Sequence, residues 1–124
     1  MKLNNFIKKY QNVTTHKKIK KLIKDTFVKN NLKKIKILEF GVDKGISTSL
    51  FLEYCEKTNS KLFSVDVIDY SKLFKNKNWK FLRSRDDNKE NINRFLNSSV
   101  DIIFLDTEHT AKHVEKILYM YFNK

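Results

Sequence analysis

Four short apolar runs recur along the chain, and their alternation with helix-like segments is the feature that most constrains its fold. The runs are IKILEFGV, KLFSVDVID, WKFLRS and VDIIFLD. Helical periodicity follows the first, third and fourth runs, at residues 47–57, 88–96 and 110–122. Such runs are typical of buried parallel strands, and alternation with helices implies right-handed crossovers and a sheet covered on both faces. The sequence therefore predicts an α/β fold.

The length of 124 residues, with 40% hydrophobic residues, suits one compact domain. No stretch reaches the roughly 18 apolar residues of a membrane span, and the N-terminus lacks a continuous apolar signal segment. We therefore expect a cytoplasmic protein without a transmembrane segment. Cys55 is the single cysteine, which excludes a disulfide within one chain and agrees with a reducing compartment. We predict that Cys55 is a small buried apolar residue.

The formal net charge of +12 is concentrated at the N-terminus. Residues 1–36 hold twelve lysines against the single acid Asp25, whereas the rest of the chain is nearly neutral. Only three of the 26 basic residues are arginine, although arginine is the preferred side chain for guanine edges and bidentate phosphate contacts. This distribution argues against specific reading of DNA or RNA.

Apolar residues recur at helical spacing between Val13 and Leu32, with lysines between them. This pattern predicts an amphipathic helix, with Thr14 or Thr15 as its N-cap and His16 exposed to solvent. In one interpretation the apolar stripe packs on the sheet while the lysines stay in water. In the other, the basic helix docks on an anionic membrane surface or an acidic partner. We divide the chain into a basic N-terminal helical segment, residues 1–34, and a sheet-forming segment, residues 35–124.

The only two glycines of the chain, Gly41 and Gly45, follow the first apolar run. A glycine there permits a tight turn and a close ligand, and the free amides of the next helix favour an anionic group such as a carboxylate. A dinucleotide loop needs a second glycine at the position of Asp43, whose charge repels phosphate. The lysine and hydroxyl of a P-loop are also missing.

The remaining pattern, Glu39-x-Gly41-x-x-x-Gly45, resembles the first motif of class I S-adenosylmethionine-dependent methyltransferases. The resemblance implies that Glu39, Gly41 and Gly45 bind the methionine part of the donor. A ribose-binding carboxylate is expected roughly 20 residues further on, where Asp66 ends the second run; the alternative is that Asp66 only caps a loop. After the third run, the resemblance places Asp86, rather than Asp87, near the adenine amine.

The segment Asp106-Thr107-Glu108-His109 resembles the D-x-x-H segment of methyltransferase family 24, near relatives of catechol-type O-methyltransferases. The resemblance implies that Asp106 faces the donor or, with Glu108, holds a divalent cation such as Mg²⁺. His109 would then face the acceptor as a base. The alternative is that Glu108 is a helix-start acid and His109 a loop residue.

This resemblance covers roughly residues 35–118 and implies a Rossmann-like three-layer sandwich with parallel strand order 3-2-1-4. Family members continue with three more strands, so we expect a truncated domain whose fourth strand is covered by another copy or a second chain. The expected function is O-methylation of a small molecule or sugar by S-adenosylmethionine, with no specific nucleic acid. The alternative is a catalytically inactive module that binds the cofactor or, through its N-terminal lysines, another protein.

Overall fold

The computed structural model describes residues 2–105, and its centre is a sheet of four parallel strands. Their order is β3-β2-β1-β4, with β1 paired to both β2 and β4. The strands are β1 (Lys36–Phe40), β2 (Lys61–Asp66), β3 (Trp79–Arg83) and β4 (Ile102–Leu105). The predicted α/β class, strands and strand order are confirmed.

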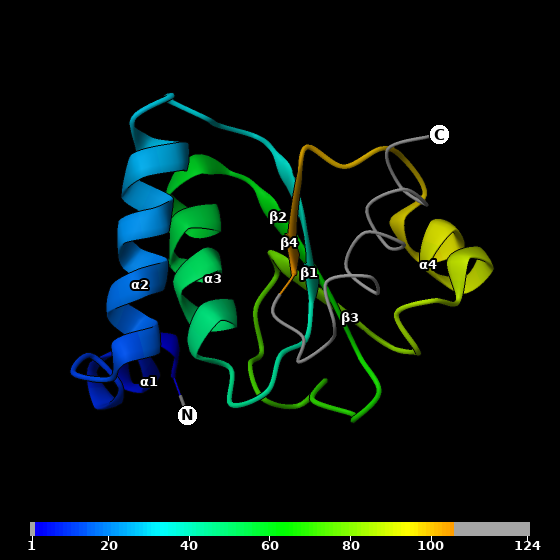
Figure 1. Cartoon of the computed structure of the whole chain (residues 1–124), viewed down its shortest axis with the longest axis horizontal. Helices are drawn as coiled ribbons and strands as arrows, with labels where there is room; N and C mark the ends of the chain where they lie inside the picture. Colours follow the sequence, from blue (N-terminus) through cyan, green and yellow to red (C-terminus); the bar gives the residue numbers. More distant parts are fainter. Residues whose placement is uncertain (1, 106–124) are drawn as a thin grey trace.

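Helices cover both faces of the sheet (Figure 1). One face carries α3, with α2 and its π-helical continuation η1 packed outside it, and the other face carries α4; α1 lies near the start of α3. Their bounds are α1 (Leu3–Lys9), α2 (Thr14–Leu22), η1 (Ile23–Val28), α3 (Ile46–Thr58) and α4 (Lys89–Leu96). Within residues 2–105, no helix combines the length and apolar character needed to cross a membrane.

Alternate residues of β1 enter two separate hydrophobic cores. Ile37 belongs to the core beneath α3, which also contains Phe51 and Leu62. Leu38 and Phe40 belong to the core beneath α4. Because successive strand residues point to opposite faces, this division places Glu39 on the α3 side. Both faces of the central strand are therefore buried, as expected for a parallel sheet covered by helices.

The N-terminal segment contains more structure than the single predicted helix. A separate helix, α1, precedes α2, and the residue before α2 is Val13, so neither Thr14 nor Thr15 is the N-cap. The apolar stripe packs on α3, which lies between it and the sheet. In that contact the Phe27 ring lies 5.9 Å from Phe51 and 5.2 Å from Tyr54, measured between ring centroids.

His16 is buried, with 4% of its surface exposed, so the predicted solvent exposure is wrong. Its position explains the difference, because Ile19 and Ile23, three and seven residues later, are also buried and the three share one helical face. Within residues 2–105, His16 Nδ1 has no hydrogen-bond partner. Burial lowers the pKa of His16, and nearby Lys20 lowers it further, whereas Glu53 opposes the shift.

This lowered pKa predicts that the protein loses stability as the pH falls below about 6.5, the ordinary pKa of histidine. Below that value the unfolded chain binds a proton on His16 that the folded chain resists, so protonation favours unfolding. We expect His16→Gln to flatten the change in unfolding free energy between pH 7.5 and pH 5. Urea titrations of both proteins at these pH values measure it, and equal pH dependence would contradict the prediction.

Cys55 is fully buried in the core beneath α3, as predicted. Burial raises the pKa of its thiol to about 12. Since the thiolate is the reactive form of cysteine, Cys55 acts as an apolar core residue in the folded protein.

Candidate functional site

The loop between β1 and α3 is built around left-handed backbone at three positions. Gly41 has φ +93°, Asp43 has φ +52° and Gly45 has φ +88°. The Gly41 amide donates to the carbonyl of Val65 in β2 at 2.9 Å, and the Gly45 amide donates to the carbonyl of Val42 at 2.8 Å. Glycine adopts such angles without the steric cost that a Cβ adds, which explains the two glycines. We call residues 41–45 the glycine loop.

A side chain at Gly45 would meet side chains from two other parts of the chain. A Cβ atom there would come within 2.4 Å of Leu73 Cδ2, 3.4 Å of Phe6 Cζ and 3.5 Å of Phe74 Cε2. The end of the glycine loop therefore faces α1 and the connection between β2 and β3, and a new methyl group there would displace Leu73.

Gly45→Ala is expected to destabilise the fold by about 2–3 kcal/mol, because alanine is strained in left-handed backbone and its methyl group displaces Leu73. Asn97→Ala is the matched control, since Asn97 is exposed and also left-handed, with φ +59°. It should lose only about 1 kcal/mol, from backbone strain alone. Urea denaturation measures both variants, and equal losses would show that the packing at Gly45 contributes nothing.

Asp66, at the end of β2, lies against the glycine loop. Its Oδ2 accepts from the Val42 amide at 2.8 Å and, at 3.5 Å, from the Asp43 amide; its Oδ1 accepts from the Ile68 amide at 3.1 Å. A carboxylate offers about four lone-pair sites, so this half-buried group can accept further hydrogen bonds. The structure therefore brings together two parts of the predicted donor site, the glycine loop and Asp66.

Three further residues, Val67, Ile68 and Tyr70, follow Asp66 at this edge of the sheet, and the sequence alone did not indicate them as site residues. Val67 and Ile68 leave 57% and 56% of their surfaces exposed, which is unusual for large apolar side chains in adjacent positions. Burial raises the pKa of Tyr70, and the carboxylates of Asp66 and Asp43 raise it further. The negative charges of both acids therefore act on the Tyr70 hydroxyl. These residues directly follow an acid at the end of a strand, and this position in the sequence could have indicated them as candidate site residues.

Glu39 lies beneath the glycine loop and is completely buried. Its carboxylate accepts hydrogen bonds from Ser47 Oγ at 2.7 Å, Thr48 Oγ1 at 2.7 Å and Ser64 Oγ at 2.8 Å. Ser64 Oγ in turn accepts from Trp79 Nε1 at 2.9 Å. Glu39 therefore ties β1 to the first turn of α3 and to β2, and direct contact between Glu39 and a ligand stays a prediction.

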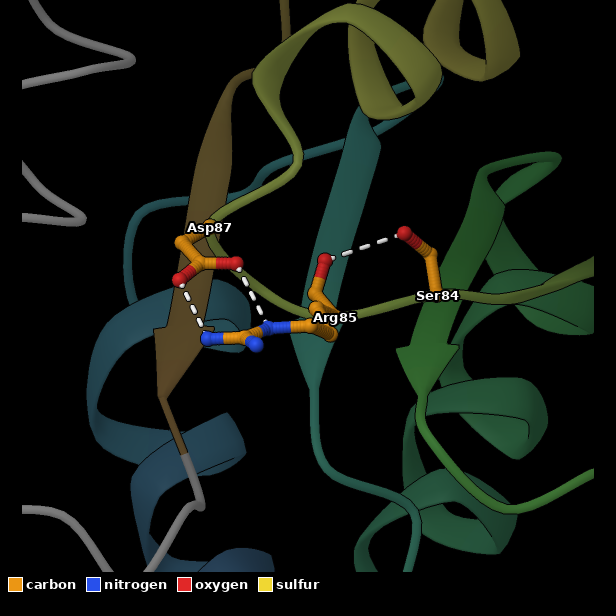
Figure 2. A network of polar contacts seen from close by, with 3 residues as sticks. All are labelled: Ser84, Arg85 and Asp87. Carbon is orange, nitrogen blue, oxygen red and sulfur yellow. Dashed lines mark hydrogen bonds and ion pairs between the residues drawn. The ribbon is translucent and has the colours of Figure 1, made fainter.

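The turn after β3 lies beside Asp66, because the Ser84 amide donates to the Asp66 carbonyl at 2.9 Å. Figure 2 shows how this turn is held: Arg85 donates to both carboxylate oxygens of Asp87, at 3.1 and 2.9 Å, and the Ser84 hydroxyl donates to the Arg85 carbonyl. Asp86 is half-buried in the same turn. Its predicted role near an adenine amine stays a prediction.

Asp106, Glu108 and His109 lie outside the described residues. Among residues 2–105, no three His, Cys, Asp or Glu side chains come together as a metal site would require. The predicted catalytic and cation-binding residues are therefore expectations from the sequence alone.

The all-parallel sheet of this order, with a left-handed glycine loop after β1 and an acid at the end of β2, is the arrangement of a class I S-adenosylmethionine-dependent methyltransferase. The chain belongs to the methyltransferase domain family known as family 24, whose sequence model matches residues 38–123. The class assigned by resemblance is confirmed, and S-adenosylmethionine is the cofactor that the family implies.

Among solved structures, the chain is similar to a ribosomal RNA methyltransferase from Plasmodium falciparum. The TM-score is 0.63 at 16% sequence identity, over 88% of this chain and 68% of that chain. This likeness supports the fold. A short chain dehydrogenase family protein from Francisella tularensis aligns with a TM-score of 0.48 at 20% identity, over 72% of this chain and 43% of that chain. No curated protein matches the sequence.

Proposed function

We propose that the edge formed by the glycine loop and Asp66 binds S-adenosylmethionine for methyl transfer. The observation that carries this proposal is the 2.8 Å hydrogen bond from the Val42 amide to Asp66 Oδ2, which joins the predicted methionine-binding loop to the predicted ribose-binding acid. Two polar elements far apart in sequence thus meet at the carboxyl ends of adjacent parallel strands, where ligands bind in open α/β sheets.

The residues at this edge fit the parts of the donor. Amides at the start of α3 suit the donor carboxylate, Asp66 can accept from ribose hydroxyls, and the exposed Val67 and Ile68 offer an apolar surface for the purine. The exposed carboxylate of Asp43 disfavours a phosphate at the same loop. When bound, the donor supplies an activated methyl group, while these side chains position it.

For the acceptor, we propose an oxygen of a small molecule or sugar. This rests on the resemblance of the Asp106–His109 segment to oxygen-directed methyltransferases, in which His109 would remove the hydroxyl proton. The similar Plasmodium protein is described as a ribosomal RNA methyltransferase, so RNA is the competing acceptor. Against RNA stands the near-neutral charge of this chain beyond residue 36 and its three arginines. Asp106 and Glu108 would hold the divalent cation, if the reaction uses one.

Calorimetric titration tests the donor proposal directly. We expect S-adenosylhomocysteine to bind with one-to-one stoichiometry, and NAD⁺ and ATP to show no heat of binding, because each would bring phosphate groups toward Asp43. Tight binding of NAD⁺, or no binding of S-adenosylhomocysteine, would contradict the proposal. Binding without methyl transfer to any hydroxyl acceptor would instead favour the inactive, cofactor-binding module.

A further inference from the structure

The end of the glycine loop is enclosed by side chains from two distant parts of the chain. Phe6 comes from α1, whereas Leu73 and Phe74 come from the connection between β2 and β3, and all three lie where a side chain at Gly45 would project. The rings of Phe6 and Phe74 meet edge to face, with centroids 4.9 Å apart. Such an arrangement adds a directional attraction to the apolar burial. We call Phe6, Leu73 and Phe74 the loop support.

The loop support is connected to both sides of the candidate site. The Leu73 amide donates to the carbonyl of Tyr70 at 2.9 Å, so the turn that carries Leu73 to the glycine loop also contains Tyr70. The Phe74 ring packs against Trp79, with centroids 5.7 Å apart. Trp79 donates to Ser64, which donates to Glu39 beneath the loop. The loop support therefore surrounds the position of Gly45, and the hydrogen bonds from Trp79 reach Glu39, two residues before the glycine loop.

Phe6 lies outside the segment that matches the methyltransferase family, which begins at residue 38. We propose that Phe6 is a positioning residue for the methyl donor, acting through Gly45 to fix the glycine loop in its binding geometry. This rests on the proposed donor site. Its physical basis is preorganisation: a loop already held in its bound shape loses less conformational freedom when the ligand binds. The N-terminal segment thereby contributes to donor affinity without touching the donor.

The test compares Phe6→Leu with Phe27→Leu. Phe27 is a matched control, because it is also a buried phenylalanine of the N-terminal segment in the same core, but its ring packs on the middle of α3. Both variants should lower the melting temperature. We expect Phe6→Leu to weaken S-adenosylhomocysteine binding by about ten-fold, since displaced binding groups lose affinity steeply, and Phe27→Leu to change it less than about two-fold.

A second measurement needs no ligand. Amide hydrogen exchange across residues 41–46 should be faster in Phe6→Leu than in Phe27→Leu, because local opening of the loop becomes easier. Equal affinities and equal loop exchange in the two variants would overturn the positioning role of Phe6. If the unaltered protein fails to bind S-adenosylhomocysteine, the proposed function falls together with this inference. Weaker binding and faster loop exchange confined to Phe6→Leu would support it.

Discussion

Asp66→Ala is expected to weaken the binding of S-adenosylhomocysteine by about 100-fold. Hydrogen bonds to a charged group contribute about 1.5–3 kcal/mol each, so the loss of two bonds to ribose hydroxyls accounts for roughly this factor. The substitution also removes the acceptor of the Val42 and Ile68 amides, which loosens the glycine loop. Calorimetric titration measures the change in dissociation constant.

Asp69→Ala is the control for this experiment. Asp69 is an exposed acid three residues further along the same connection, and its carboxylate accepts from the Ser71 amide at 3.0 Å. Removing it changes the local charge by the same amount as Asp66→Ala without altering the glycine loop. We expect the affinity of Asp69→Ala to stay within about two-fold of the unaltered protein. Equal effects of the two substitutions would argue for a general charge effect and against a ribose contact.

Glu39→Ala is expected to produce the largest loss of stability, about 4 kcal/mol. The three hydroxyl groups that donate to this buried carboxylate lose their acceptor, and each buried polar group without a partner costs about 1–3 kcal/mol. A cavity beneath the glycine loop adds to the cost. Urea denaturation followed by circular dichroism gives the change in unfolding free energy.

Glu39→Gln tests the effect of the hydrogen bonds alone, because glutamine keeps the volume of the side chain. Glutamine keeps one acceptor oxygen, and its NH₂ group can donate to a rotated hydroxyl of Ser47. We expect a loss of about 1–2 kcal/mol, well below that of alanine. If both substitutions cost less than about 1 kcal/mol, Glu39 does not hold the strands and α3 together as its contacts indicate.

The sheet could be predicted from the sequence because each strand is a short apolar run. The glycine loop could be predicted because glycine directly after a strand permits a tight turn without the steric cost of a Cβ. The N-terminus was predicted less well. α1 has only seven residues, which is too short to show a clear helical periodicity of apolar residues beside the longer periodic pattern of α2. His16 was expected at the surface because histidine is polar. Its burial depends on which face of α2 packs against α3, and the sequence does not specify that face for a polar residue.

The position of Asp66 in the candidate site was predictable, because the carboxyl ends of adjacent parallel strands meet at one edge of the sheet. The hydrogen bonds of Glu39 were not predictable, because its partners Ser47 and Ser64 come from separate elements and small hydroxyl residues carry no distinctive sequence pattern. Phe6 lies where a side chain at Gly45 would project, although the two positions are nearly forty residues apart, and only the three-dimensional arrangement shows it.

Trp79 is the only tryptophan of the chain, and its place between Phe74 and Ser64 gives the protein a built-in optical probe. Its indole emission arises from one defined position, which three hydrogen bonds connect through Ser64 and Glu39 to the first turn of α3. Fluorescence of the unlabelled protein can therefore follow events at the glycine loop in real time. Libraries of donor analogues could be screened in this way before any methyl acceptor is identified.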